Sequence, residues 1–264
     1  MNKHLQIAIE SSLKAGIAIM QVYETAFNVE TKDDNSPLTE ADMQANTIIN
    51  SYLLPTQISI ISEENKQTDY SIRKNWNTCW IVDPVDGTKE FVKRNGEFTV
   101  NIALVTNGKP VLGVIYVPAT KTLYYAEVDS NKAFKADLKS HDTSFEQVLK
   151  LAEKLQPKKK KSKVIQVVGS RSHMNKETLD FIESLKSEGK DVEIVSKGSS
   201  LKFCLLAEGL ADVYPRFAPT MEWDTAAGHA ICNAVGLEVI STETKKPLVY
   251  NKENLLNSHF LVGV

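Results

Sequence analysis

Two aspartates that flank a short proline-containing turn carry the strongest chemical signal in this sequence. They stand three residues apart in residues 80–91, which read WIVDPVDGTKEF. Two carboxylates this close supply hard oxygen ligands, and Mg²⁺ usually binds through one or two carboxylates together with waters and substrate phosphate. The pair, Asp83 and Asp86, therefore predicts a magnesium site beside a phosphate group. The alternative interpretation of the string is a proline-aspartate-glycine turn with solvated acids.

The neighbours of this pair fit a ligand site at the end of a strand. Residues 79–82 are apolar and predict a short buried strand. We expect Pro84 to end that strand, because proline has no N–H to give to a sheet. Gly87 allows the backbone to come close to a ligand, and a helix that began here would point its free N–H groups at a phosphate. Gly87 and Thr88 are therefore expected to contact substrate.

Three other segments carry acids that can complete such a site. The apolar run 58–62 has the length of a strand and delivers two glutamates, the first of which is Glu63. Asp224 precedes a helical-looking run, where it fits both a helix N-cap and a metal ligand. Asp42 follows Thr39 by three residues, as the acid of a capping box would. Each segment alone has an ordinary structural explanation, namely a solvated loop for the glutamates and a helix cap for each aspartate.

Taken together, three motifs resemble the lithium-sensitive, magnesium-dependent phosphatase superfamily that contains inositol monophosphatase and fructose-1,6-bisphosphatase. The motifs, in that superfamily's order, are Ser62-Glu63-Glu64, Asp83-Pro-Val-Asp86-Gly-Thr88 and Trp223-Asp224-Thr-Ala-Ala-Gly228. Within it, residues 86–91, 93–98 and 198–204 are similar to the bacterial CysQ-type 3'(2'),5'-bisphosphate nucleotidases. The resemblance runs along nearly the whole chain.

This resemblance implies an α+β fold, a layered αβαβα sandwich of the sugar phosphatase type. It also implies a phosphomonoester hydrolase that removes the 3'-phosphate of adenosine 3',5'-bisphosphate, the by-product of sulfate activation, to give AMP and phosphate. The 3'-phosphosulfate relative of that nucleotide is a further candidate substrate. Two alternatives stay open, because fold does not decide function: a phosphatase for inositol phosphate or another sugar phosphate, and a non-catalytic nucleotide sensor.

The resemblance also assigns roles to single residues. It implies two or three Mg²⁺ ions per active site, and the expected metal ligands are Glu63, Asp83, the carbonyl of Val85, Asp86 and Asp224. Asp42 and Thr88 are expected to orient the attacking water. The expected substrate-binding residues are Gly87, Thr88, Lys89, His173, Ser199, Ser200, Lys202, Arg216 and Asp224. Without the resemblance, His173 would be interpreted as a surface or capping histidine, and Lys202 and Arg216 as solvated charges.

Composition narrows the class of protein. With 264 residues, of which 42% are hydrophobic, the chain can build a sizeable core and is expected to form two subdomains. The net charge of −2 gives no general affinity for nucleic acid polymers, so the expected partner is a small-molecule nucleotide. Cys79, Cys204 and Cys232 lie in apolar sequence without metal-site spacing, which favours reduced, buried thiols. No apolar run approaches a membrane-spanning length.

From these limits we expect a soluble cytoplasmic protein. Peripheral contact with the cytoplasmic face of the inner membrane stays open, and so does the choice between a monomer and a homodimer. The basic run 157–163 has two interpretations, an exposed linker extended by its own charge and a contact with an anionic membrane or nucleotide.

The elements that must position these residues fall into two halves. Residues 1–156 are expected to form an α+β subdomain that carries most metal ligands, with helices over 3–24, 39–54 and 142–155, the two short strands above, and an antiparallel meander over 98–105, 110–117 and 122–127. Residues 157–264 are expected to form an α/β subdomain that carries Asp224 and the specificity residues, with strands over 164–168, 192–195, 211–214 and 260–262 and helices over 177–187, 201–208 and after 224.

Overall fold

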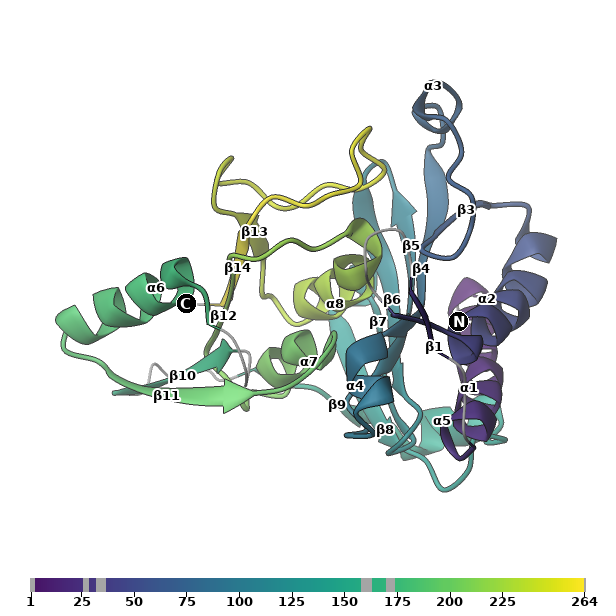
Figure 1. The fold of residues 1–264 in the computed structure, drawn as a ribbon, viewed down its shortest axis with the longest axis horizontal. Helices are drawn as coiled ribbons and strands as arrows, with labels where there is room; N and C mark the ends of the chain where they lie inside the picture. The colour runs from purple at the N-terminus through teal and green to yellow at the C-terminus, as the bar shows by residue number, and fades with distance from the viewer. Residues whose placement is uncertain (1–2, 26–28, 32–36, 158–162, 170–173, 264) are drawn as a thin grey trace.

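The computed structural model describes residues 3–25, 29–31, 37–157, 163–169 and 174–263, and it shows two large β-sheets interleaved with layers of helices (Figure 1). The elements of the first half are α1 (Lys3–Tyr23), β1 (Val29–Thr31), β2 (Pro37–Thr39), α2 (Glu40–Leu53), β3 (Ser59–Ser62), α3 (Tyr70–Arg73), β4 (Thr78–Asp86), α4 (Thr88–Val92), β5 (Thr99–Thr106), β6 (Lys109–Val117), β7 (Thr122–Glu127), β8 (Lys132–Asp137), α5 (Phe145–Leu151) and β9 (Glu153–Lys154). Two short 3₁₀ turns, Leu54–Thr56 and Val128–Ser130, follow α2 and β7. A separate two-stranded antiparallel sheet joins β1 and β2.

The elements of the second half alternate between strand and helix, as the sequence predicts. They are β10 (Val164–Gly169), α6 (Lys176–Ser187), β11 (Asp191–Ser196), α7 (Leu201–Ala207), β12 (Val213–Arg216), α8 (Glu222–Ala234), β13 (Val239–Ser241) and β14 (Phe260–Gly263). The strands form a sheet of order β11-β10-β12-β14-β13. In this sheet β10 is parallel to both of its neighbours, β11 and β12. Strand β14 is antiparallel to its neighbours, β12 and β13.

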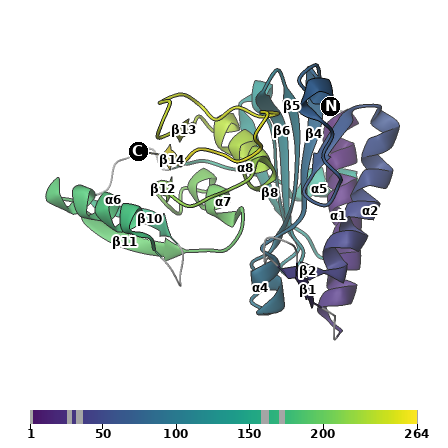
Figure 2. The same ribbon diagram turned by 45° about the horizontal axis from the view of Figure 1, so that its top comes forward.

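The larger sheet has the order β3-β4-β5-β6-β7-β8-β9, with β3 parallel to β4 and the other neighbours antiparallel. Helices α1 and α2 cover one face of it, and α8 covers the other. Helix α7 joins α8 in the middle layer against the second sheet, whose far side carries α6 (Figures 1 and 2). This arrangement confirms the predicted αβαβα sandwich.

Burial on both faces explains the composition of the central strands. All residues of β5 except its last are buried, because α1 packs on one face and α8 on the other. A strand covered on both sides needs a nearly continuous apolar run, and the segment TVNIALVT provides one with few interruptions. Gly113 of β6 lets α8 come close, since a Cβ atom there would overlap the carbonyl oxygen of Ala227. Thr99 and Asn101 are buried polar residues in this otherwise apolar strand, so their side chains are expected to have specific partners.

The structure corrects the prediction that Pro84 ends its strand. β4 continues through Pro84 to Asp86, and its register with β5 shifts by one residue between Asp83 and Asp86. The partner β3 pairs only as far as Val82, so β4 has a neighbour on one side beyond that point. A proline is tolerated at such a bulge on a one-sided strand, because no ladder hydrogen bond is lost.

Other boundaries differ in smaller ways. The helix expected over 142–155 is shorter, because Ser144 caps α5 with its side chain and the chain turns into β9 after Leu151. Strands β8, β9 and β13 were not foreseen. The basic run lies mostly outside the described residues. The largest apolar cluster joins residues of both halves, among them Cys79 and Phe203. The subdomain boundary near residue 156 stays a prediction.

Candidate active site

Three aspartates from two elements converge beside the end of β4. Asp83 and Asp86 come from β4 and Asp224 from the first turn of α8, and one carboxylate oxygen of each lies within 4.8 Å of the others. In a regular strand, residues three apart point to opposite faces. The extra residue in the β4 bulge changes this alternation and brings both side chains into one cluster. The bulge is thus what makes the two-aspartate motif a site.

The electrostatics of the cluster oppose its own ionisation. The side chain of Asp83 is only 1% exposed, and burial followed by the charges of Glu63, Asp86, Asp224 and Asp42 raises the pKa of its carboxyl group well above the usual range. Burial and the neighbouring Asp86 raise the pKa of Asp224 to about 8. Carboxylates gathered without a cation favour their neutral forms for these two reasons.

The donor set fits a hard divalent cation. Among the residues that the structure describes, Asp83 Oδ1 is a buried oxygen without a hydrogen-bond partner. An orphaned buried acceptor is costly unless something else satisfies it. Oxygen donors alone, from several carboxylates, are the ligands that Mg²⁺ takes. The arrangement therefore meets the sequence-based expectation of a metal site.

Two more predicted acids face this cluster. Glu63 directly follows β3, and its N–H donates to the carbonyl oxygen of Val82 at 3.2 Å, which holds it beside the residue before Asp83. Asp42 lies in the first turn of α2 and is 1% exposed. Both charges act on Asp83 and raise its pKa, so both lie within electrostatic reach of it. The five acids, Asp42, Glu63, Asp83, Asp86 and Asp224, thus come from α2, the end of β3, β4 and α8.

Gly87 and Thr88 form the turn between β4 and α4. Gly87 has a φ of +94° and precedes α4, and a Cβ atom there would overlap the hydroxyl oxygen of Ser199. A glycine is needed for both reasons. The Thr88 hydroxyl lies 3.5 Å from the carbonyl oxygen of Val85, at the outer limit of a hydrogen bond. Thr88 and the predicted carbonyl ligand are therefore close neighbours.

The two predicted serines fasten α7 to this turn. The Ser200 hydroxyl lies 2.9 Å from Asp86 Oδ2 and 2.9 Å from the carbonyl oxygen of Asp224, and it can donate to one of them at a time. The Ser199 hydroxyl lies 2.8 Å from the Asp86 carbonyl oxygen and 2.7 Å from that of Glu97. Because these bonds go to Asp86 and to the backbone of Asp224, the two serines help to position both acids.

An open cavity of about 430 Å³ adjoins the acid cluster. Its lining includes Asp86, Gly87, Glu90, Lys93, Asn95, Glu97, Lys197, Gly198, Ser199, Lys202, Phe203, Tyr214, Arg216, Thr220, Asp224 and Thr225. Volumes of this order are typical of small-molecule sites. The lining combines acids, among them Asp86 and Asp224, with basic side chains, most of which come from the second half of the chain.

Two of these cations are well suited to an anion. Lys202 is 9% exposed, donates to the Ser199 carbonyl oxygen at 2.9 Å and lies over the Tyr214 ring at 5.9 Å. Burial lowers the pKa of Lys202 to about 8, although Asp86 acts in the opposite direction. Arg216 donates to the Pro219 carbonyl oxygen at 3.0 Å, and its Nε has no partner among the described residues. The pair presents positive charge that the protein only partly satisfies.

Three predicted substrate residues, Thr88, Lys89 and Ser200, are not among the described residues that line the cavity. Lys89 is exposed on α4. His173 lies outside the described residues. Of the two interpretations of Asp224, the structure does not show the N-cap, because Met221 is the N-cap residue of α8. Asp224 lies in the first turn of the helix, where its Oδ2 accepts from the Met221 N–H at 2.9 Å and its carboxylate belongs to the acid cluster.

Sequence reasoning missed Asn101, Glu97 and Tyr214. Asn101 pairs with Asp83 across the β4–β5 register, and its Nδ2 donates to Ser200 Oγ at 2.9 Å. Glu97 accepts from the Gly198 N–H at 2.9 Å. A polar asparagine inside an apolar strand was a visible signal, whereas the role of Glu97 depends on a contact 101 residues away.

Comparisons with known proteins agree with this geometry. The sequence profile of the inositol monophosphatase family matches residues 1–261. The 3'(2'),5'-bisphosphate nucleotidase CysQ of Salmonella typhimurium strain LT2 is 43% identical, over 98% of this chain and 99% of that protein. The crystal structure of CysQ from Bacteroides thetaiotaomicron has a TM-score of 0.87 and 49% identity, over 98% of this chain and 96% of that one. The extragenic suppressor protein suhB from Bartonella henselae, at 23% identity, a TM-score of 0.76 and 99% and 94% coverage, shares the fold.

Proposed function

The chain belongs to the inositol monophosphatase family, and from this premise we propose that it is a magnesium-dependent 3'(2'),5'-bisphosphate nucleotidase. Its substrate would be adenosine 3',5'-bisphosphate, and its products AMP and phosphate. The observation that carries the proposal is one cavity lined both by two aspartates of the acid cluster, Asp86 and Asp224, and by two partly satisfied cations, Lys202 and Arg216. A nucleotide with two phosphates needs both kinds of partner, one for the phosphate that is cleaved and one for the phosphate that is kept.

The residues of the acid cluster fit the role of metal ligands. Asp83, Asp86 and Asp224 supply carboxylate oxygens, and Glu63 and the carbonyl oxygen of Val85 lie beside them. Bound Mg²⁺ supplies positive charge for the phosphoryl oxygens and lowers the pKa of a bound water. The buried, unpartnered Asp83 Oδ1 is the atom that most needs such an ion.

The chain itself contributes orientation and charge to the reaction. The Thr88 hydroxyl beside the Val85 carbonyl, together with the buried carboxylate of Asp42, would orient the attacking water. Fixed donors of this kind act through position, because no rearrangement is needed at the moment of reaction. The bonds from Ser199 and Ser200 hold the β4–α4 turn in place while this happens.

Lys202 and Arg216 would hold the phosphate that is not cleaved. Charge-assisted hydrogen bonds to phosphate are strong, and arginine can make two in parallel. Burial lowers the pKa of Lys202 more than the nearby acid Asp86 raises it, so a phosphate dianion beside the amine would favour its charged form. The nucleotide reading of the site therefore explains a buried lysine that packing alone does not require.

The remaining parts of the proposal concern the cellular compartment, the metabolic context and an inhibitor. We place the enzyme in the cytoplasm, in the sulfur-assimilation reactions that form this nucleotide; the three buried free cysteines, Cys79, Cys204 and Cys232, fit a reducing compartment. Among the described residues, no helix has the length and apolar character needed to cross a bilayer. We also propose inhibition by Li⁺, a hard cation that would compete at the same oxygen ligands.

One assay tests substrate and metal together. Phosphate release is measured with adenosine 3',5'-bisphosphate, its 3'-phosphosulfate relative, inositol 1-phosphate, inositol 1,4-bisphosphate and fructose 1,6-bisphosphate, each with Mg²⁺, with Mg²⁺ plus Li⁺, and with a chelator. We expect the highest kcat/KM for one of the two nucleotides, no turnover with chelator, and less turnover with Li⁺. A preference for an inositol phosphate or fructose bisphosphate would overturn the nucleotide assignment. Absence of turnover on every compound would favour a sensor.

A further inference from the structure

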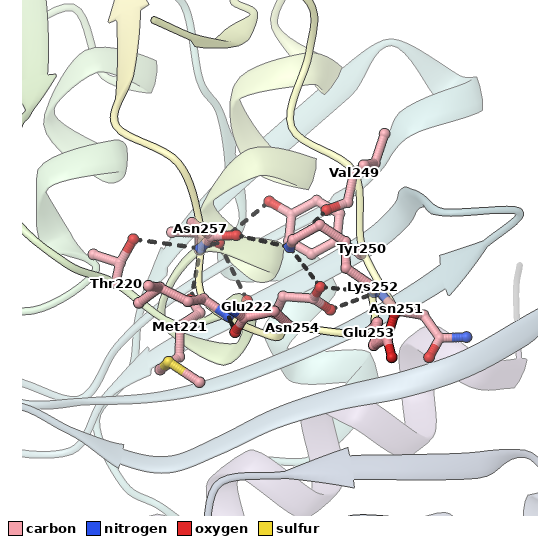
Figure 3. Close-up of polar contacts among 12 residues, drawn as sticks. Thr220, Met221, Glu222, Val249, Tyr250, Asn251, Lys252, Glu253, Asn254 and Asn257 are labelled. Carbon is pink, nitrogen blue, oxygen red and sulfur yellow. Dashed lines mark hydrogen bonds and ion pairs between the residues drawn. The ribbon is translucent and has the colours of Figure 1, made fainter. Parts of the chain in front are cut away.

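The N-terminal turn of α8 is attached to a segment near the end of the chain, residues 249–257, which has no regular secondary structure over most of its length. Figure 3 shows Glu222 of α8 directed at Lys252 of this segment. The Glu222 N–H also donates to the Leu255 carbonyl oxygen at 3.0 Å, and Met221 forms an isolated bridge with Leu256. The segment thus runs alongside the turn that carries Asp224.

Glu222 is a buried carboxylate with a complete set of donors. Its side chain is fully buried and accepts from the Asn251 N–H at 2.6 Å, the Lys252 N–H at 3.0 Å and Lys252 Nζ at 2.6 Å. Lys252 Nζ also lies 3.1 Å from the Val249 carbonyl oxygen. A charge buried this deeply persists only when it is paired and hydrogen-bonded. The ion pair therefore fixes the distance between α8 and the segment.

Asn257 makes a second attachment to the same turn. Its Nδ2 donates to the Met221 carbonyl oxygen at 2.8 Å and to Thr225 Oγ1 at 3.0 Å, and its N–H donates to the Thr220 carbonyl oxygen at 2.8 Å. Its Oδ1 lies 3.3 Å from Lys252 Nζ, which connects the two attachments. Figure 3 shows Asn257, Thr220 and Met221 gathered on this side of the segment.

Arg73 of α3 binds the same segment. It is 3% exposed, and its guanidinium donates to Asn251 Oδ1 at 2.9 Å, the Lys252 carbonyl oxygen at 2.7 Å and the Glu253 carbonyl oxygen at 2.9 Å. Three bonds from a planar, permanently charged group restrict the segment strongly. The segment is thus a fixed support to which α8 is attached.

The bonds between α8 and this segment also restrict the position of Asp224. Residues 222 and 224 are separated by about 200° around a helix, so Glu222 faces the segment while Asp224 faces the acid cluster. One carboxylate oxygen of Asp224 lies within 4.8 Å of oxygens of Asp83 and Asp86, so a shift of the end of α8 would take Asp224 out of this cluster. Bonds on the opposite face of the helix resist such a shift.

We propose that Glu222, Lys252 and Asn257 act as positioning residues that hold Asp224 in place for metal binding. The inference rests on the proposed function, because it takes Asp224 as a metal ligand. We call these three residues the α8 clamp. Partners that orient metal ligands typically change metal affinity about 10- to 100-fold when they are removed. The clamp acts through the backbone of the helix, so we expect the lower end of that range.

The test measures metal binding without substrate. Mn²⁺ binds hard oxygen ligands as Mg²⁺ does, and free Mn²⁺ can be counted by electron paramagnetic resonance in the full-length protein. Lys252→Met removes the charge that pairs with Glu222, and Lys252→Arg keeps it. Lys135→Met is the matched control, because Lys135 pairs with Glu208 at 2.8 Å and is 30% exposed, whereas Lys252 is 29% exposed.

We expect the Mn²⁺ dissociation constant to rise about tenfold in Lys252→Met and in Asn257→Ala, and to stay close to wild type in Lys252→Arg and Lys135→Met. Unchanged Mn²⁺ affinity in Lys252→Met, or an equal loss in the control, overturns the inference. If circular dichroism shows that Lys252→Met is unfolded, Asn257→Ala decides by the same criterion. Asp224→Asn separates the two proposals: if it binds Mn²⁺ as the wild type does, the metal site itself is misplaced and the proposed function fails with it.

Discussion

Replacing Lys202 by methionine should make the ligand-free protein more stable and the enzyme worse. Lys202 is 9% exposed, and burial lowers the pKa of its amine from 10.5 to about 8. Methionine has a similar unbranched shape, so the substitution removes the charge and keeps most of the packing. The two effects have opposite directions because they act on different states, the empty protein and the complex with substrate.

The size of the stability effect follows from the pKa. A fall from 10.5 to about 8 corresponds to about 3 kcal/mol against the charged form, at about 1.4 kcal/mol for each pKa unit. The substitution also loses the 2.9 Å hydrogen bond to the Ser199 carbonyl oxygen, which contributes about 1 kcal/mol. Lys202→Met should therefore raise the free energy of unfolding by about 2 kcal/mol at pH 7.

The gain in stability should depend on pH. A lysine whose pKa is lowered by folding destabilises the fold fully below the folded pKa, here about 8. That cost fades as the pH rises from about 8 toward 10.5, where the amine also loses its proton in the unfolded chain. The advantage of Lys202→Met should accordingly be largest at pH 7 and nearly absent at pH 10.5.

Catalysis supplies the second measurement. The loss of a charged hydrogen bond, about 1.5–3 kcal/mol, should lower kcat/KM for adenosine 3',5'-bisphosphate about tenfold to a hundredfold. Adenosine 3'-monophosphate lacks the second phosphate and should be affected little. Urea unfolding with a chelator at pH 7 and pH 10, together with kcat/KM for both nucleotides, completes the experiment. A lower free energy of unfolding for Lys202→Met at pH 7, or equal losses of kcat/KM on both nucleotides, would contradict this prediction.

Three further predictions concern the acid cluster. Asp83→Asn should abolish turnover while the metal-free protein stays folded and gains stability, because one repelling charge is gone; activity near wild type would contradict the metal assignment. Thr88→Ala should lower kcat about 100-fold with little change in KM, and a raised KM at unchanged kcat would contradict its orienting role. The Mg²⁺ dissociation constant should fall about tenfold per pH unit from pH 6 to 8 and then level off, because Mg²⁺ competes with the proton on Asp224, whose pKa is about 8. A dissociation constant that does not vary with pH would remove Asp224 from the ligand set.

Local patterns predicted the elements well because each has a strong period and clear ends. Helix α2 keeps Ala41, Ala45, Ile49 and Leu53 at intervals of four, and all four side chains are buried. The strands of the meander are bounded by glycine and proline. Chemistry was equally visible, because three acids of the cluster stand in motifs whose residues are contiguous. Elements and acids whose signal lies in contiguous residues were therefore the easiest to predict.

The missed features depend on contacts between distant residues. The bulge in β4 depends on how this strand pairs with β5, and the residue types at 83–86 do not predict that the strand continues through Pro84. The Glu97 carboxylate accepts a hydrogen bond from the distant Gly198 N–H, and the Glu222 carboxylate accepts hydrogen bonds from the N–H groups of residues 251 and 252. Residues 249–257 have neither helical nor alternating spacing, so pattern reasoning passed over the segment that supports α8. Pairing partners of this kind follow from the tertiary fold and are not written in local sequence.

The acids and the lysine of this site share one property, which links folding to binding. Burial favours the neutral form of Asp83 and Asp224 by raising their pKa values, and it favours the neutral form of Lys202 by lowering its pKa. In the ligand-free protein, ionisation of each of these groups therefore costs free energy. A cation at the acids and a phosphate at the lysine would offset that cost, so each ligand that binds the folded state also stabilises it. The α8 clamp and the Ser199 and Ser200 contacts are what keep the charges in place until those ligands arrive.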